Sequence, residues 1–252
     1  MLELRLPLAA SAELEIHPAT SYPAGMHHEC VAAIQMKRIT AERRFDEVHG
    51  FTQTFGRWLD VGCGDGRFVQ VVGEQGIDAS GVELSAEAVC LAKNNGLNVT
   101  CGTVNSLPEK NSFDTITAFD VLGHVLDPAE FLSEIFKRLH PNGTLVLTLP
   151  DTNSLSRRLM GRRWYFYNSE ESLHYFSRDN LGSLLEATGF KVNITRRTYK
   201  LFSWEFWLTQ SAEFDPIVHR ILSRTEVVLP SSMRQKVIPL PIGEMMLVAG
   251  RR

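Results

Sequence analysis

The chain has 252 residues, enough for one sizeable α/β domain with insertions, and its 44% hydrophobic and 22% charged residues are ordinary for a globular protein. A formal net charge of -3 gives no overall attraction to nucleic acid, so we expect no nucleic-acid partner. The four cysteines show no C-x-x-C spacing, and no apolar run approaches the ~18 residues of a membrane-spanning helix, so we expect a cytoplasmic protein without a transmembrane segment.

Residues 1–50 are predicted to form a tail and one or two helices that cover a substrate site. Glu3 and Arg5 interrupt any apolar core of a signal peptide. From residue 29 to 49, apolar residues recur at helical spacing, at Val31, Ile34, Ile39, Phe45 and Val48. The group His27, His28, Glu29 and Cys30 matches no zinc-ligand spacing, so we predict no metal site.

Three glycines at alternate positions, Gly62, Gly64 and Gly66, follow a short apolar run at residues 58–61 and precede a helix predicted at 67–75. A strand that enters a glycine-rich turn and then a helix presents backbone N–H groups to a polar or anionic ligand. Dinucleotide folds favour G-x-G-x-x-G, whereas this turn reads G-x-G-x-G with Asp60 two residues before it. The spacing therefore disfavours a nicotinamide oxidoreductase.

Strand and helix patterns then alternate along the chain. Strands are predicted at residues 78–83, 98–101, 114–119 and 144–149, and helices at 85–93 and 128–139. Ser85 and the pair Asp127-Pro128 are N-terminal helix signals, and Gly76 is a C-terminal one. This alternation favours a doubly wound parallel sheet with helices on both faces.

After residue 150 the alternation stops. Residues 151–175 are predicted to be a loop with a short helix, followed by a helix at 178–188 and a sixth strand at 190–195. An insertion at about 198–241 precedes a seventh strand at 244–250. Residues 151–252 hold 15 Lys and Arg against 10 Asp and Glu, whereas residues 1–150 hold 11 against 19. This basic part suits an acidic substrate or an anionic membrane surface; the alternative is a set of solvated helix faces.

The run Trp164, Tyr165, Phe166 and Tyr167 lies beside the arginines at 157, 158, 162 and 163. Aromatic walls with guanidinium groups could bind an acidic acceptor, and the alternative is a packed aromatic patch with solvated arginines. Leu155 and Leu159, at i and i+4, are predicted to lie on the inner face of the short helix.

Several segments together resemble the class I S-adenosylmethionine-dependent methyltransferases, in their small-molecule branch. They are the glycine turn, Gly81-Val82-Glu83-Leu84-Ser85, the run Phe119-Asp120-Val121-Leu122-Gly123-His124-Val125, residues 138–145, and His174-Tyr175-Phe176-Ser177. The resemblance covers about residues 50–196 and the last strand. It implies a Rossmann-like, seven-stranded, mostly parallel sheet with an antiparallel last strand, and a domain at 51–252 with insertions at about 151–175 and 198–241.

The cofactor that the resemblance implies is S-adenosylmethionine. A carboxylate at the position of Glu83 would accept both ribose hydroxyls, and Leu84 would pack on the adenine. Thr103 stands where the family usually has Asp, and Gly123 where it commonly has Glu. The candidate cofactor residues are Asp60, Gly62, Cys63, Gly64, Gly66, Glu83, Leu84, Thr103, Val104, Phe119 and Asp120.

The implied function is methyl transfer to a small-molecule acceptor, at oxygen, with an acidic or lipid-linked acceptor such as a quinone precursor or a glycan. The candidate catalytic residues are His124 and His174, either of which could instead be structural. Asp120 lies either near the methionine amino group or in a simple strand-end turn. The alternative function is a non-catalytic partner protein that binds S-adenosylmethionine; the oligomeric state, monomer or homodimer, stays open.

Overall fold

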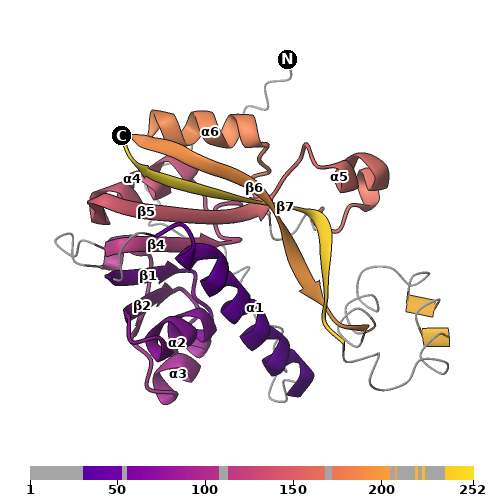
Figure 1. Ribbon diagram of the computed structural model, residues 1–252, viewed down its shortest axis with the longest axis horizontal. Coiled ribbons are helices and arrows are strands. Elements are labelled where there is room, and N and C mark those ends of the chain that lie inside the picture. The colour runs from indigo at the N-terminus through magenta and orange to yellow at the C-terminus, as the bar shows by residue number, and fades with distance from the viewer. Residues whose placement is uncertain are drawn as a thin grey trace, which may run out of the picture.

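A seven-stranded sheet forms the centre of the computed structural model, which describes residues 31–52, 56–107, 113–167, 172–204, 208, 219–220, 223–224 and 236–252. The strands are β1 Arg57–Val61, β2 Asp78–Glu83, β3 Val99–Cys101, β4 Phe113–Phe119, β5 Leu139–Pro150, β6 Phe190–Phe202 and β7 Ile238–Arg251. Their order is β3-β2-β1-β4-β5-β7-β6 (Figure 1). The first five are parallel, and β7 lies antiparallel between β5 and β6. The predicted fold class and the antiparallel last strand are confirmed.

Two of the helices begin at start signals identified in the sequence. The helices are α1 Val31–His49, α2 Arg67–Glu74, α3 Ala86–Asn94, α4 Pro128–Arg138, α5 Leu155–Met160 and α6 Arg178–Ala187, with short 3₁₀ turns η1 Val104–Ser106 and η2 Gly161–Arg163. The Ser85 hydroxyl accepts a hydrogen bond from the Ala88 N–H and so caps α3. Asp127 accepts from two N–H groups at the start of α4, where Pro128 occupies the first turn.

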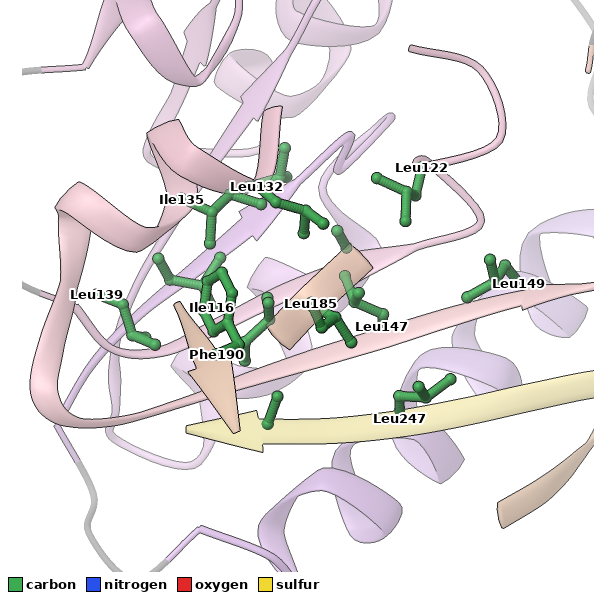
Figure 2. Close-up of a cluster of buried hydrophobic side chains, with 14 of the residues drawn as sticks. Ile116, Leu122, Leu132, Ile135, Leu139, Leu147, Leu149, Leu185, Phe190 and Leu247 are labelled. Carbon is green, nitrogen blue, oxygen red and sulfur yellow. The ribbon is translucent and has the colours of Figure 1, made fainter. Parts of the chain in front are cut away.

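Alternate residues of the central strands pack on opposite faces of the sheet. Leu145, Leu147 and Leu149 of β5 contact α4 and α6 in the larger core, with Ile116, Leu132, Ile135, Leu185 and Phe190 (Figure 2). Val146 faces the other way and joins the core beneath α1 and α2. A strand has a side-chain period of two, so a strand buried on both faces reads as a continuous apolar run. Residues 144–149 show this pattern.

Strands β5, β6 and β7 are longer than the sequence predicts. Strand β5 begins at Leu139, five residues before its predicted start at 144. Strand β6 continues to Phe202 and pairs with the start of β7, with Phe202 opposite Ile238. The predicted insertion at 198–241 therefore starts and ends in strand. Paired polar and proline-containing positions carry no alternating pattern, which is why the prediction stopped short.

The predicted inner face of α5 is wrong. Leu155 and Leu159 are 62% and 77% exposed, and Trp164, just beyond the helix, is the buried residue. Spacing of i and i+4 shows that two residues share a face, but it does not show which face the protein covers. Trp164 and Phe166 are packed in the interior, whereas the four arginines are exposed, which matches the alternative of a packed aromatic patch with solvated arginines.

Some predictions fall on other parts of the chain. The tail at 1–30, with His27, His28, Glu29 and Cys30, lies outside the described residues, as does most of the predicted insertion, at 205–207 and over most of 209–235. Among the residues the structure describes, one helix precedes β1, and no group of His, Cys, Asp or Glu could hold a metal ion. No helix in these ranges is long and apolar enough to span a membrane.

Candidate cofactor site

The glycine turn between β1 and α2 has a backbone that side chains would disrupt. Gly62, Gly64 and Gly66 have φ of 72°, 54° and 79°, in the left-handed region that favours glycine. A Cβ on Gly62 would lie 2.4 Å from the Val121 side chain, at the end of β4. The turn therefore packs closely against the segment that follows β4. Without side chains on the glycines, its backbone N–H groups are accessible to a ligand.

Glu83, at the end of β2, has its carboxylate fixed beside the glycine turn. One oxygen accepts a hydrogen bond from the Gly64 N–H and the other from the Ser85 N–H, both at 2.9 Å. Each carboxylate oxygen has two lone pairs, so one on each oxygen is left for the O–H donors of a ligand. The side chain is 7% exposed, which makes such bonds strong. This arrangement fits the ribose hydroxyls of S-adenosylmethionine.

The residues around Glu83 differ in what they can offer a ligand. Leu84 is 42% exposed and gives the turn an apolar surface. The Cys63 side chain is buried between α2 and α3, where burial raises the pKa of its thiol, so Cys63 could contact a ligand only through its backbone. The Val104 side chain is also buried, in the larger core. Thr103 caps η1 in a reciprocal pair with Ser106, which engages its hydroxyl.

Asp60 lies in β1 below the turn and is 6% exposed. Its carboxylate accepts a hydrogen bond of 2.6 Å from the Thr117 hydroxyl of β4. Burial raises the pKa of Asp60 to about 7, against the opposing effect of the Thr117 bond and with a contribution from the charge of Glu83. The Asp60 carboxyl group is therefore a buried link between β1, which carries the glycine turn, and the neighbouring strand β4.

Asp120 follows β4 at the same edge of the sheet, and it is the one residue other than glycine with positive φ, 58°, in the described ranges. Its N–H donates to the Thr148 carbonyl at 2.8 Å, and its carboxylate lies 3.1 Å from the Lys200 ammonium. Asp tolerates the left-handed region better than most residues, but such backbones are strained and concentrate at functional sites. Phe119, just before it, packs edge-on against Phe68.

Asp120 belongs to a cluster of four charged residues that no sequence pattern indicated. We call Arg44, Asp120, Lys200 and Glu244 the charge cluster. Arg44 of α1 donates to Glu244 of β7 at 2.6 Å and to the Thr198 hydroxyl at 3.0 Å. The Lys200 ammonium lies 3.9 Å from Glu244 and 5.0 Å from the centre of the Phe166 ring. The cluster joins α1, β4, β6 and β7.

The cluster members shift one another's ionisation. Burial and the Asp120 charge raise the pKa of Glu244. Burial alone would raise the pKa of Asp120, but the positive charges of Lys200 and Arg44 outweigh it and lower that pKa. The pKa of Lys200 is raised by Asp120 and Glu244 in spite of burial. Lys200 is therefore a cation at neutral pH and cannot serve as a base there.

The two histidines predicted as catalytic lie in segments that the fold brings together. The Leu173 and His174 N–H groups both donate to the Gly123 carbonyl, at 2.9 and 3.0 Å. His174 Nε2 lies 3.2 Å from the Leu126 carbonyl, which can only accept, so Nε2 is the donor in that bond, and a neutral imidazole in this tautomer has its lone pair on Nδ1. His124 closes the turn after β4 through its N–H, which donates to the Val121 carbonyl. A catalytic role for either residue stays a prediction.

The family of the chain follows from comparison with known proteins. A family profile described as "Methyltransferase domain" matches residues 34–193, and the chain belongs to this family. It is 32% identical to the mitochondrial ubiquinone biosynthesis O-methyltransferase of Schizosaccharomyces pombe over a segment of 113 residues. This segment covers 41% of this chain and 39% of that protein. It is 26% identical over 172 residues to the ubiquinone biosynthesis O-methyltransferase of Psychrobacter arcticus, covering 62% and 67%. The chain thus spans only part of the length of the relatives it matches.

Solved structures show the same fold at lower identity. A methyltransferase from Thermotoga maritima, described as S-adenosylmethionine-dependent, has a TM-score of 0.56 at 19% identity, over 86% of this chain and 90% of that one. The magnesium protoporphyrin IX methyltransferase of Synechocystis, with bound SAH, has a TM-score of 0.56 at 14% identity, over 89% and 90%. The predicted family is confirmed, and the cofactor that it implies is S-adenosylmethionine. The fixed carboxylate of Glu83 and the glycine turn fit that cofactor.

Proposed function

We propose that this chain transfers a methyl group from S-adenosylmethionine to a hydroxyl oxygen of a small-molecule acceptor. The observation that carries the proposal is the Glu83 carboxylate. The Gly64 and Ser85 N–H groups hold it in place, and each of its oxygens keeps one lone pair for a hydroxyl of the ligand. When bound, the cofactor supplies an electrophilic methyl group. Reaction at oxygen is supported by the relatives named as O-methyltransferases, of which the chain matches a part.

The chain's own task is to orient the acceptor and to handle a proton. Positioning can supply about 7–11 kcal/mol in well-oriented systems, and a base adds about 10²–10⁴-fold. The hydroxyl of the acceptor loses its proton as the new O–C bond forms. We propose His174, through Nδ1, as the group that takes the proton, with His124 in the adjoining turn as the second candidate.

We also propose that residues 1–50 cover the site and that residues 51–252 form the methyltransferase domain. In support, Lys37 of α1 pairs with Asp65 of the glycine turn at 3.3 Å, and Arg44 of the same helix reaches Glu244. Helix α1 therefore contacts both the glycine turn after β1 and strand β7. A cytoplasmic location and an acidic or lipid-linked acceptor belong to the same proposal.

The first test is calorimetric titration of the purified chain with S-adenosylmethionine and S-adenosylhomocysteine, with NAD as the control. We expect micromolar binding of the first two and none of NAD. The second test follows transfer of a labelled methyl group to phenolic acceptors that differ in the length of an apolar chain. Cofactor binding without transfer to any hydroxyl would reject the O-methyltransferase and favour the non-catalytic partner.

A further inference from the structure

Residues 155–163, which we call the α5 arm, expose large apolar side chains. Leu155 is 62% exposed, Leu159 77% and Met160 47%. These residues follow one another within two turns, so they form one patch on a short element. An isolated exposed leucine is ordinary, whereas three large apolar side chains together on a projecting element indicate a surface for contact.

The same arm is strongly basic. Arg157, Arg158, Arg162 and Arg163 are exposed, and no acidic residue occurs between positions 152 and 167. None of the four forms an ion pair with another described residue, and Arg157 donates to the Tyr167 hydroxyl at 3.0 Å. The arm therefore presents positive charge without a compensating carboxylate from the described part of the chain.

The exposure of these side chains is imposed by packing. Trp164 is 2% exposed, and its indole N–H donates to the Ile242 carbonyl of β7 at 2.9 Å. The Ser156 hydroxyl donates to the same carbonyl at 2.7 Å. A Cβ on Gly243 would lie 2.4 Å from the Ser154 and Ser156 hydroxyl oxygens, so the arm sits directly on the β7 backbone. The serine face is inward, which fixes the leucines outward.

The arm lies at the edge where the parallel strands end and where ligands bind in such sheets. Figure 1 shows α5 beyond the arrowhead of β5, apart from the helices that cover the sheet. Two other exposed apolar residues lie in the segments that follow β4 and β5 at this edge, Leu126 at 53% and Leu173 at 48%.

We propose that the α5 arm docks on an anionic phospholipid surface, with Leu155, Leu159 and Met160 at the headgroup boundary and the arginines against lipid phosphates. Apolar residues interleaved with arginine on one projecting surface are typical of interfacial binding. Nucleic acid is disfavoured because the exposed leucines would have no role against a phosphate backbone. If the chain is a methyltransferase, its acceptor would come from the bilayer. Only this consequence rests on the proposed function.

The test is co-sedimentation of the full chain with vesicles of phosphatidylcholine alone or of an equal mixture with phosphatidylglycerol. We expect binding to the anionic vesicles only, weakened in 1 M salt, where charges are screened beyond about 3 Å. The double variant Arg158→Glu, Arg162→Glu should lower the partition constant by at least about 25-fold, from about fivefold for each arginine. Leu155→Ser, Leu159→Ser should lower it at least tenfold.

Matched controls come from α3, on another part of the surface. Leu91 is 51% exposed and Lys93 is exposed, so Leu91→Ser removes one exposed leucine and Lys93→Glu reverses one exposed positive charge away from the arm. Both should leave vesicle binding within twofold of the parent chain. Calorimetry with S-adenosylhomocysteine on every variant separates this inference from the proposed function, because the arm variants should bind it normally and so prove folded.

Equal binding to both vesicle types would overturn the proposal, as would equal losses in the arm and control variants. It would also be overturned by binding to a single-stranded RNA oligonucleotide that exceeds vesicle binding at the same salt. A chain that binds S-adenosylhomocysteine but no anionic vesicle keeps the cofactor site and loses the docking surface.

Discussion

Substituting Glu83 by glutamine tests the cofactor site most directly. The carboxylate accepts from two backbone N–H groups, one on each oxygen. In Glu83→Gln one oxygen becomes an NH₂ group, which would face either the Gly64 or the Ser85 N–H, donor against donor. A hydrogen bond to a charged group is worth about 1.5–3 kcal/mol. Glu83→Gln removes the negative charge and one hydrogen bond to the ligand. This loss should therefore cost about 2–3 kcal/mol of binding free energy, or about 30- to 150-fold in Kd.

The assay is calorimetric titration with S-adenosylhomocysteine. The control is Glu87→Gln, which makes the same chemical change on an exposed residue of α3, one turn beyond Glu83. A melting curve for each variant shows that the fold is kept. A Kd for Glu83→Gln within twofold of the parent value, in folded protein, would show that this carboxylate does not hold the ligand.

Three further outcomes follow from the packing. Arg44→Leu should lower the free energy of unfolding by about 3–5 kcal/mol in chemical denaturation, because it strands the buried Glu244; Arg44→Leu with Glu244→Leu should recover part of it, and equal losses would argue against the pair. Asp60→Asn should raise the Tm more at pH 8 than at pH 5. The folded pKa of about 7 lies above the unfolded value of 3.8, so the parent loses stability as pH rises between them, and an equal shift at both pH values would contradict this. Gly62→Ala should destabilise the fold by about 1–3 kcal/mol, with partial rescue by Val121→Ala, and no rescue would place the strain in φ alone.

Predictions that rest on local signals are confirmed by the structure. Strand β2 has the predicted bounds, and Ser85 caps α3 as expected, because a cap needs only its own few residues. The position of Glu83 beside Gly64 also follows from sequence, since adjacent parallel strands place their carboxyl ends at one edge of the sheet. The antiparallel β7 came only from the family resemblance.

The charge cluster could not be predicted because its members are far apart in sequence. Arg44 and Glu244 are 200 positions apart, and each is an ordinary charged residue of its own element. Their meeting depends on the order β5-β7-β6 and on the packing of α1 over that part of the sheet, which no local pattern encodes. The outward leucines of α5 were missed for the same reason. The leucine side chains point outward because Ser156 and Trp164 donate hydrogen bonds to the Ile242 carbonyl of β7.

The extended pairing of β6 and β7 accounts for both features that the sequence did not show. Strand β6 carries Lys200 because it continues past its predicted end at 195, and the paired β7 begins at Ile238, before the arm's anchor at Ile242. In this extension, β6 supplies Lys200, the cation beside Asp120 and its strained backbone. The paired β7 supplies the Ile242 carbonyl, to which the α5 arm is hydrogen-bonded. Glu244 lies two residues after Ile242 in β7, and Lys200 contacts both Glu244 and Asp120. A displacement of β7 at Ile242 would therefore change the surroundings of Asp120. Asp120 and the α5 arm are therefore both held by the paired strands β6 and β7.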